Sequence, residues 1–531
     1  MELLSPKHQN SRSRPLISRL PGLRLPRWRH VALFAAVAYT LYCYLFSLPL
    51  FAHPLPQHTG PYAVGTIDIE AAVSSPRIIE PDIRFKSTGA SALKLETVLF
   101  SLYYPTPYSN GNNRLTSHPR RHPWIPAPLS LRAQGYARAA HISNWLTDAL
   151  FTVIICALVG SITIPAAVDA PLIDAPSSSH NNGHPIIIFS HGTVSSRTDY
   201  SHFAGELAAR GYIVAMLEHR DGSCPGTTIH PPSQDNNDKA PRPLLLFSHT
   251  DVSFPNHTSP TLEALHAAQL AFRESEIEET VSILKAINSG HGPQISHSNP
   301  LREGRSTLST WTSRLNTDAI IISGHSYGAT GALASLRGGP CPARPFAGAI
   351  LLDPGKSSGP LNSDIHVPIL VVHSNSWSSH KSLFYNGRAH FDTVKDIVAS
   401  NLLRGNPSWF MTSLGTSHPS VTDAPLLEPW LLSFTTGAMV DVYQGLRQYV
   451  HVAEDFVGFV MGKEAGAGEM RGLLKERAEF PQYDPGWGFG VWKPGQGGGD
   501  GGKEGGKEGG EWWDWRRYWQ IHVAPVGWEG E

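Results

Sequence analysis

The sequence predicts an α/β fold with a mostly parallel central sheet and helices on both faces of that sheet. Two observations lead to this prediction. Short apolar runs of strand length recur along the middle of the chain, and helical stretches separate several of them. Each run also leads into unusual polar residues, and reactive groups gather at the carboxyl ends of the strands in such sheets. Alternating strands and helices indicate a parallel sheet that is covered on both sides.

Five apolar runs are the expected strands, and the stretches between them are the expected helices. The strand candidates are residues 185–189, 213–217, 319–322, 349–352 and 369–372. The helical candidates are residues 200–210, 262–288 and 329–336. The domain built from these elements is expected to span residues 60–455.

Composition excludes several classes of protein. The chain has 531 residues, with 43 Lys+Arg against 44 Asp+Glu and a formal net charge of −1. This balance excludes a globally basic nucleic-acid coat and an acidic disordered tail protein, so no nucleic-acid partner is expected. The 4 cysteines are scattered and form no CxxC pair, which excludes a disulfide scaffold and a Cys-rich zinc site. The charged fraction of 16% is below the roughly 25% of ordinary soluble domains.

The N-terminal part of the chain predicts a membrane anchor. Residues 31–52 carry no charge and are numerous enough to cross a hydrocarbon core of about 30 Å. Residues 1–30 are basic, with Glu2 the only acid, and the positive-inside rule keeps such a segment in the cytoplasm. We therefore expect a transmembrane signal-anchor at 31–52 and a lumenal or extracellular catalytic domain. A cleaved signal peptide, which would give a secreted protein, and a buried helix are the alternatives.

A second uncharged apolar stretch covers residues 149–168. Gly160 and Pro165 break its last third, and the remaining helical part is short for a membrane span. We expect a helix that is buried or that dips into a membrane surface. A second membrane span is the alternative.

The C-terminal extension, residues 456–531, has a different composition. From Gly495 it is a run of Gly, Lys and Glu that cannot bury apolar area, which predicts a disordered linker. A cluster of tryptophans and arginines follows the linker. It could lie at a membrane interface or be a poorly ordered terminus. Its members are Trp512, Trp513, Trp515, Arg516, Arg517 and Trp519.

Residues 324–328 read Gly-His-Ser-Tyr-Gly and fit the pattern G-x-S-x-G between an expected strand and an expected helix. At such a position the chain turns sharply, and the serine is strained and exposed at the top of the sheet. Gly324 and Gly328 let the backbone pack closely around the turn. A purely structural glycine turn is the alternative, but the strand-to-helix context favours Ser326 as a nucleophile.

A serine nucleophile needs a base, and the base needs an orienting acid. In folds with this serine turn the order along the chain is serine, acid, histidine. Asp353 directly follows the next expected strand and is the expected acid, although an ordinary strand-end turn is its alternative reading. His418 lies in a loop after the apolar residues 409–411 and is the expected base. His373 ends an expected strand and is the competing candidate.

Acyl transfer also needs donors for the developing oxyanion. The backbone amide of Tyr327, next to the nucleophile, is one expected donor. The other is the amide of Thr193 in the early loop Ser190-His191-Gly192-Thr193. The side chain of His191 is either an orienting group behind this loop or a hydrogen-bonded turn residue.

The sequence resembles a known family at several of these places. Residues 189–192, 218–223, 324–328, 352–353 and 417–418 are similar to the platelet-activating factor acetylhydrolases of the plasma and intracellular type II kind, also called lipoprotein-associated phospholipase A2. The resemblance extends from about residue 61 to about residue 450. Thr193 and Tyr327 replace an apolar residue and a phenylalanine that are usual in that family.

The resemblance implies an α/β-hydrolase fold and calcium-independent hydrolysis of a short or oxidised acyl chain at the sn-2 position of a phosphatidylcholine-like lipid. It implies the triad Ser326, Asp353 and His418, with no metal and no cofactor. It also implies that apolar helices near the site dock on lipid, which suits residues 149–168. Glu218, His219 and Arg220 are expected to form a buried supporting network, with a phosphate contact by Arg220 as the alternative.

Two other functions fit the same residues. A general carboxylesterase or neutral lipase would use the same triad. A membrane-tethered, non-catalytic binding protein would keep the fold without the chemistry, but the complete Ser-Asp-His set argues against it.

Overall fold

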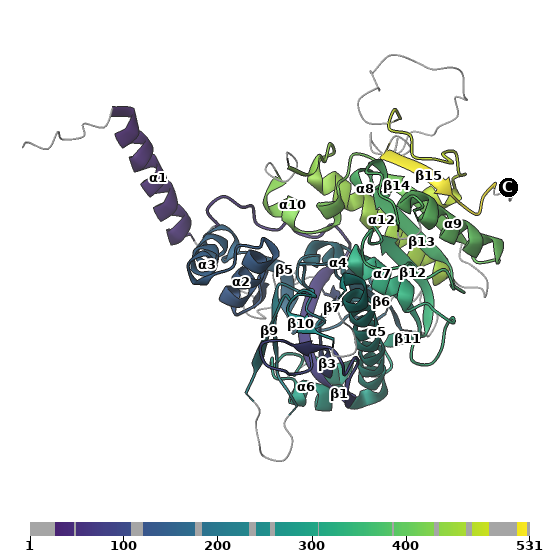
Figure 1. The fold of residues 1–531 in the computed structure, drawn as a ribbon, viewed down its shortest axis with the longest axis horizontal. Coiled ribbons are helices and arrows are strands. Elements are labelled where there is room, and N and C mark those ends of the chain that lie inside the picture. Colours follow the sequence, from purple (N-terminus) through teal and green to yellow (C-terminus); the bar gives the residue numbers. More distant parts are fainter. Residues whose placement is uncertain are drawn as a thin grey trace, which may run out of the picture.

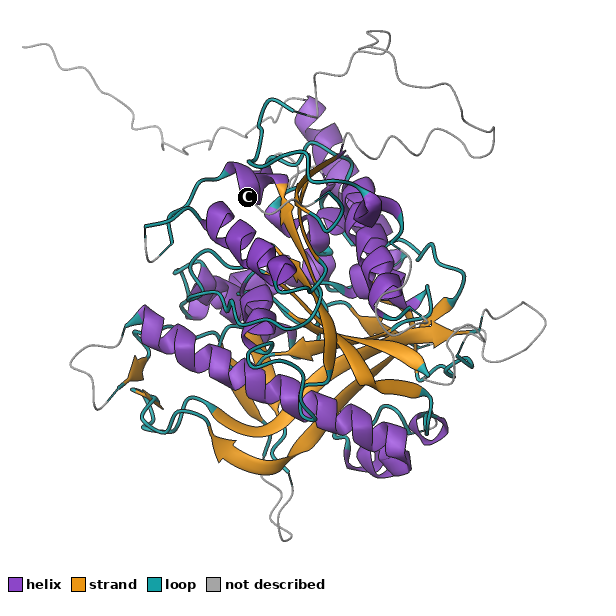
Figure 2. Ribbon diagram, turned by 90° about the vertical axis from the view of Figure 1, so that its right-hand side faces the viewer, coloured by secondary structure: helices purple, strands orange, loops and turns teal. Residues whose placement is uncertain are grey.

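A large twisted sheet forms the centre of the molecule (Figure 2). The computed structural model describes residues 27–46, 49–107, 120–175, 183–232, 240–254, 261–305, 307–384, 387–429, 435–462, 470–487 and 518–527. The central sheet has 11 strands in the order β15-β14-β13-β12-β11-β6-β7-β3-β1-β5-β4. Two pairs of short strands, β2 with β10 and β8 with β9, lie outside it.

The middle of the sheet is parallel. It consists of β7 (Ile213–Glu218), β6 (His184–Ser190), β11 (Leu315–His325), β12 (Phe346–Leu352), β13 (Ile369–Ser374) and β14 (Ser408–Ser413). The five predicted strands are the first five of these, at adjacent positions. The prediction of an α/β fold with a mostly parallel sheet is therefore confirmed. Because these strands run in one direction, their carboxyl ends meet at one edge.

Further strands extend the sheet on both sides. β3 (Lys94–Thr106) and β1 (Ala63–Ile78) run antiparallel beyond β7, and β5 (Thr163–Val168) pairs parallel with β1. The outer strands are β4 (Arg121–Pro123) and β15 (Trp519–Val523). The small pairs are β2 (Arg84–Phe85) with β10 (Val252–Ser253), and β8 (Gly226–Ile229) with β9 (Arg242–Leu245).

Helices cover both faces of the sheet, as predicted (Figure 1). Each face has its own cluster of buried apolar side chains. On β6, Ile186 and Ile188 point into one cluster, whereas Ile187 and Phe189 point into the other. This alternation explains why the strand is apolar throughout, since both of its faces are buried. The first face packs against α5 (Leu262–Ala286), α7 (Tyr327–Ala334) and α9 (His390–Leu403), and the second against α4 (Ser201–Ala208) and α12 (Val442–Val460).

The other described helices are shorter or lie at the periphery. They are α1 (Arg27–Leu45), α2 (Leu129–Ala139), α3 (Trp145–Val159), α6 (Gly292–Ser298), α8 (Asn375–Ser379) and α10 (Ala424–Leu427). Single turns of 3₁₀ or π helix occur at Ile287–His291, Leu308–Thr310, His418–Val421 and Gly472–Lys475.

The first helix differs from the predicted membrane anchor. α1 stands away from the body of the molecule in Figure 1 and ends at Leu45, well before residue 52. Pro49 lies inside the apolar segment, and a proline does not continue a helix because it has no N–H donor. None of the described helices combines the length and the apolar character that a membrane span requires. The span predicted at 31–52 therefore finds no support in the described helices.

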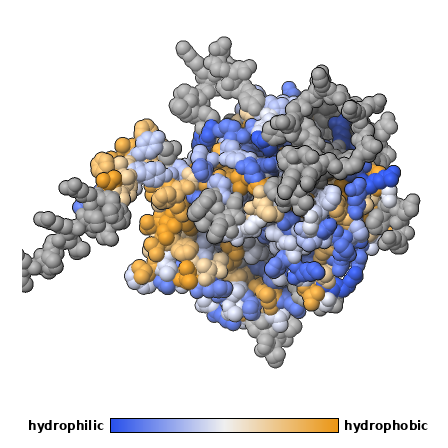
Figure 3. All heavy atoms as spheres, turned by 90° about the horizontal axis from the view of Figure 1, so that it is seen from above, coloured by the Kyte–Doolittle hydropathy of each residue, from blue (hydrophilic) through white to orange (hydrophobic). Residues whose placement is uncertain are grey.

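The second apolar stretch, residues 149–168, is not one helix. Its first part belongs to α3, and its last residues form β5 in the central sheet. Gly160 ends α3, so the helix break predicted from Gly160 is present, but the continuation is a strand. None of the residues of α3 is buried. The apolar surface in Figure 3 gathers on the side of the molecule that carries α1 and α3. Of the two expectations for this helix, burial is therefore wrong, and contact with a membrane surface stays a prediction.

The end of the chain also departs from the expectation of a disordered tail. Residues 488–517, which hold the Gly-rich linker and most of the Trp/Arg cluster, lie outside the described residues. Trp519, however, begins the edge strand β15, which pairs antiparallel with β14. Its side chain is buried in the cluster that also contains Trp409 and Leu473. Burial of apolar side chains stabilises the position of β15, whereas a run of glycines has no apolar side chains to bury.

Candidate active site

Ser326 occupies a strained turn at the carboxyl edge of the sheet. It lies between the last residue of β11 and the first residue of α7, with φ of 57° and ψ of −122°. A positive φ is uncommon for a residue with a side chain and marks a conformation that its surroundings enforce. A Cβ on Gly324 would lie 2.4 Å from the Gly328 carbonyl oxygen, and one on Gly328 would lie 1.9 Å from the Ser190 carbonyl oxygen. Both glycines are therefore required for this turn.

Asp353 follows β12 and also has a positive φ, 47°. Its carboxylate is buried and accepts three hydrogen bonds. Oδ1 accepts the Ser374 N–H at 2.6 Å, and Oδ2 accepts the Ser374 hydroxyl at 2.7 Å. Oδ2 also lies 2.8 Å from Nδ1 of His418. The carboxylate is thus held by the end of the neighbouring strand and oriented toward the histidine.

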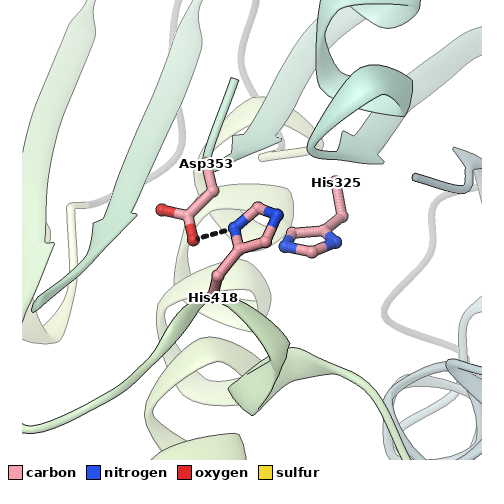
Figure 4. A group of neighbouring side chains, drawn as sticks. All are labelled: His325, Asp353 and His418. Atoms are coloured by element: carbon pink, nitrogen blue, oxygen red, sulfur yellow. Dashed lines mark hydrogen bonds and ion pairs between the residues drawn. The ribbon is translucent and has the colours of Figure 1, made fainter. Parts of the chain in front are cut away.

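His418 begins a turn of 3₁₀ helix in the loop that follows β14. Its Nδ1 contacts Asp353, and its side chain is 31% exposed (Figure 4). The ring of His325, the residue immediately before Ser326, lies with its centroid 4.4 Å from that of His418. The histidine is therefore next to the serine turn, and the three residues predicted as a triad meet at one edge of the sheet.

The competing candidate, His373, lies in a different environment. Its side chain is buried on β13, and Nδ1 is 3.2 Å from the Ser378 hydroxyl. Burial, followed by the positive charge of neighbouring groups, lowers the pKa of His373 well below its usual value. Its described contacts include rings of His390 and Phe410 but no carboxylate. The geometry favours His418 as the base.

The loop predicted to supply an oxyanion donor runs beside Ser326. A Cβ on Gly192 would lie only 3.2 Å from the Cβ of Ser326. The Gly192 N–H is already used, because it donates to the Tyr200 hydroxyl at 3.1 Å. The next amide is that of Thr193, whose side chain is exposed. Val194 then has a φ of 57°, which is strained for a β-branched residue.

The second predicted donor, the amide of Tyr327, is at the first position of α7. Amides in the first turn of a helix have no acceptor within the helix, and the helix dipole favours negative charge there. Thr193 and Tyr327 both line a cavity of about 510 Å³. Its wall also includes Phe247, Leu265 and His266, so it combines apolar and polar surface, while Ser326 and His418 are not among the residues that line it.

His191, Glu218, His219 and Arg220 lie behind this loop, and none of them is exposed. The Glu218 carboxylate pairs with Arg132 and Arg197. Burial would raise the pKa of Glu218, but the two guanidinium groups lower it to about 2. His191 Nε2 accepts the His219 N–H at 3.0 Å, and its Nδ1 is 2.7 Å from the Gly192 carbonyl oxygen.

The other two members of the group are engaged in the same way. His219 contacts Glu276 and the Ser190 hydroxyl at 2.6 and 2.7 Å. Arg220 pairs with Glu70 at 2.8 Å and is 2% exposed, so it has no access to a lipid phosphate. These residues form a scaffold that holds the strand ends in place. We call Glu218, His219, Arg220 and their partners the strand-end network.

Two groups of the described residues have enough ligand atoms close together for a metal ion. One is His325, Asp353 and His418, in which Asp353 and His418 already bond to each other. The second consists of Asp68, His122 and Glu303. There, Arg197 and Arg120 already pair with the two carboxylates. The protein's own hydrogen bonds and ion pairs account for both groups.

Comparison with known proteins adds a family to this geometry. The family model described as platelet-activating factor acetylhydrolase, isoform II, matches residues 51–460. The chain belongs to this family. A platelet-activating factor acetylhydrolase of Bos taurus is 26% identical over 284 residues, 53% of this chain and 52% of that protein. One of Cavia porcellus is 24% identical over 337 residues, 62% of each chain.

The chain thus spans about half to three fifths of the length of these two relatives. Among solved structures, a ferulic acid esterase from Streptomyces cinnamoneus superposes with a TM-score of 0.41 at 15% identity. This superposition covers 77% of this chain and 92% of that one. The family assignment agrees with the resemblance seen in the sequence.

Several residues of the site were not predicted from the sequence. Ser374 holds the carboxylate of Asp353, and its place at the carboxyl end of a predicted strand was a usable signal. Tyr200 and Arg273 gave none, because the sequence does not link the residue before α4 or the middle of α5 to the site. Arg273 is fully buried and donates to the His191 carbonyl oxygen at 2.7 Å.

Proposed function

We propose that the chain is a serine hydrolase of the α/β-hydrolase fold that cleaves the sn-2 ester of phospholipids with a short or oxidised acyl chain. The observation that carries the proposal is the strained, partly exposed Ser326 beside the bonded pair of Asp353 and His418. Membership in the platelet-activating factor acetylhydrolase family supports the choice of a phospholipid ester. The cavity that Thr193 and Tyr327 line has room for an acyl group.

The proposed reaction begins when Ser326 Oγ attacks the ester carbonyl and His418 Nε2 takes its proton. Asp353 keeps the His418 Nδ1–H directed toward its carboxylate and stabilises the imidazolium that forms. The amides of Thr193 and Tyr327 donate to the oxyanion. His418 then protonates the leaving lysolipid oxygen, and in the second half it activates water that releases the acid from Ser326.

The proposal also includes a lipid surface as the place of action. α3 exposes apolar side chains on several sides, including Trp145 at 81% and Val153 at 66%. A helix with such side chains gains free energy when they enter the interfacial region of a bilayer. The predicted lumenal or extracellular position of the catalytic domain is a separate proposal. Protease protection of sealed membrane vesicles tests it, and digestion of the domain from the cytoplasmic side would reject it.

The substrate is tested by ester hydrolysis with the purified full chain. We expect release of acetate from a 2-acetyl phosphatidylcholine without calcium, and much slower hydrolysis of a long-chain phosphatidylcholine or a triglyceride. Faster hydrolysis of p-nitrophenyl esters or triglycerides than of the acetyl phospholipid would instead indicate a general carboxylesterase or lipase. Absence of hydrolysis of every ester would leave a binding protein and reject the proposal.

The surface is tested with vesicles of phosphatidylcholine. Replacing Val153 and Leu150 with serine should weaken vesicle binding, while hydrolysis of a monomeric soluble ester stays within about twofold. Each of these apolar side chains contributes about 1 kcal/mol or more when it is removed from water. Unchanged vesicle binding by this variant would show that α3 is not the docking surface.

A further inference from the structure

Two aromatic rings lie against the His418 imidazole. The indole of Trp377 stacks on it with centroids 4.0 Å apart and planes 9° apart. The His325 ring lies 4.4 Å away with planes 36° apart. The nearly parallel indole therefore covers one face of the imidazole, and the tilted His325 ring lies close beside it. The plane of the imidazole is therefore set by its neighbours.

The hydrogen bond to Asp353 alone would not set this plane. It fixes the position of Nδ1, at 2.8 Å from the carboxylate oxygen, but leaves rotation of the ring about that contact open. His418 also stands in a loop with its side chain 31% exposed, so solvent surrounds part of the ring. The reaction, however, requires Nε2 to face Ser326, and a small misplacement of a reacting group can lower the rate by about 10²-fold.

The indole of Trp377 is itself held firmly. Its Nε1–H donates to the carbonyl oxygen of Pro354 at 3.0 Å, in the residue that follows Asp353. Lys356 places its ammonium 4.4 Å from the centroid of the indole and donates to the Trp377 carbonyl oxygen at 2.7 Å. The segment that carries the acid therefore also fixes the ring that stacks on the base.

The short helix α8, to which Trp377 belongs, contacts the backbone of His418 as well. The His418 N–H donates to the Ser376 hydroxyl at 2.9 Å. Ser374, which caps α8, accepts the Trp377 N–H at 3.3 Å and donates to Asp353. One turn of the chain, residues 374–377, thus touches the acid, the main chain of the base and the face of its ring.

We propose that Trp377 is the positioning residue of the base: its indole face holds the His418 imidazole in the plane that directs Nε2 to Ser326. This inference rests on the proposed serine hydrolase function. An aromatic face also stabilises a cation above it, so the same contact favours the imidazolium that forms during the reaction. Trp377 takes no proton and forms no bond with the substrate.

Substitution of Trp377 tests the proposal. Trp377→Leu keeps an apolar side chain but removes the ring face, and kcat should fall about 10- to 100-fold with KM within about twofold. Trp377→Phe restores a ring face and should recover most of the activity. Trp487→Leu is the matched control, since Trp487 is 51% exposed and has no described contact with the site; it should behave as the unmodified chain. Thermal unfolding of all variants identifies any that fail to fold.

The rate at which a fluorophosphonate labels Ser326 separates the positioning role of Trp377 from the hydrolase function on which it rests. Labelling needs the base but no particular ester. The positioning role is supported if the unmodified chain is labelled, if the labelling rate falls about tenfold or more in Trp377→Leu, and if the rate recovers in Trp377→Phe. Equal labelling rates in all three chains, or a raised KM with unchanged kcat, would overturn that role while the hydrolase function stands. Absence of labelling in the unmodified chain would reject the hydrolase function itself.

Discussion

Two polar clusters lie at the carboxyl ends of neighbouring parallel strands, and they differ in burial and in backbone strain. Ser326 and Asp353 have positive φ values of 57° and 47°, and His418 keeps 31% of its side chain exposed. Glu218 and Arg220, in the strand-end network, are 1% and 2% exposed, and neither has a positive φ. Both clusters follow the rule that polar groups gather at this edge.

The difference between the clusters separates chemistry from support. Strain that the fold enforces is characteristic of functional sites, and a reacting atom needs access to substrate. The strand-end network instead pairs each buried charge, as a group that only has to hold the backbone must do. Location at the strand ends therefore does not by itself distinguish the proposed triad from its supporting network, whereas the backbone strain at Ser326 and Asp353 does.

The largest expected effect in this comparison is at Ser326. Ser326→Ala should lower kcat for the acetyl phospholipid by at least about 10⁴-fold, because the nucleophile is removed and no neighbouring group replaces it. The thermal midpoint should stay within a few degrees. Steady-state hydrolysis and calorimetry measure the two quantities. Retained hydrolysis in this variant would place the chemistry elsewhere.

The next effect is at the acid. Asp353→Asn should lower kcat by about 10³- to 10⁴-fold with little change in KM, because an amide cannot hold the His418 Nδ1–H toward it as a carboxylate does. The Ser374 contacts at 2.6 and 2.7 Å lose part of their acceptor strength as well. Steady-state hydrolysis of the acetyl phospholipid measures kcat and KM of this variant. If kcat changed by less than about tenfold, Asp353 would belong with the supporting residues.

Glu218 should show the opposite pattern. Glu218→Gln leaves Arg132 and Arg197 short of a buried partner, and removal of one member of a buried ion pair costs about 3–5 kcal/mol. We expect a marked loss of stability in urea, with kcat of the folded protein within about threefold. Glu454→Gln is the control, because Glu454 is 38% exposed and its pair with Arg210 is worth about 1 kcal/mol or less. A stable but inactive Glu218→Gln variant would contradict the supporting role of the strand-end network.

His122 offers a smaller, pH-dependent test of a paired buried cluster. Burial would lower its pKa, but Asp68 and Glu303 raise it to about 10. The folded pKa lies above the unfolded value of about 6.5, so this stabilisation is complete below pH 6.5 and is lost as the pH rises toward 10. His122→Gln should therefore destabilise by about 1–3 kcal/mol more at pH 6 than at pH 10. Urea unfolding at pH 6 and at pH 10 measures the free energy of unfolding of both chains. An equal loss of stability at the two pH values would contradict the pairing of His122 with Asp68 and Glu303.

The sequence predicted the parts of the fold that depend on local pattern. The five parallel strands follow from short apolar runs, and the turn at Ser326 follows from the G-x-S-x-G pattern between an expected strand and an expected helix. The long antiparallel strands β1 and β3 were not predicted, nor was β15, which joins the sheet after a long Gly-rich stretch. Such pairings join residues far apart along the chain, and no local pattern records them.

The same limit applies to the site. Asp353 and His418 could be proposed because each follows a strand of the sheet. Trp377 could not, because its contact with His418 depends on how the loops after β13 and β14 pack on each other. The apolar segments 31–52 and 149–168 show a different limit. Hydropathy alone did not reveal that α1 ends at Leu45, or that the second segment ends in a strand.

The most direct test of the account is to trap the covalent intermediate on Ser326. The full chain is mixed with 2-acetyl phosphatidylcholine in excess, quenched in acid during turnover, digested and analysed by mass spectrometry. We expect an added acetyl group on the peptide that contains Ser326, and none in the Ser326→Ala variant. Turnover with no acetylated Ser326 peptide, or an acetyl group on a different residue, would contradict it.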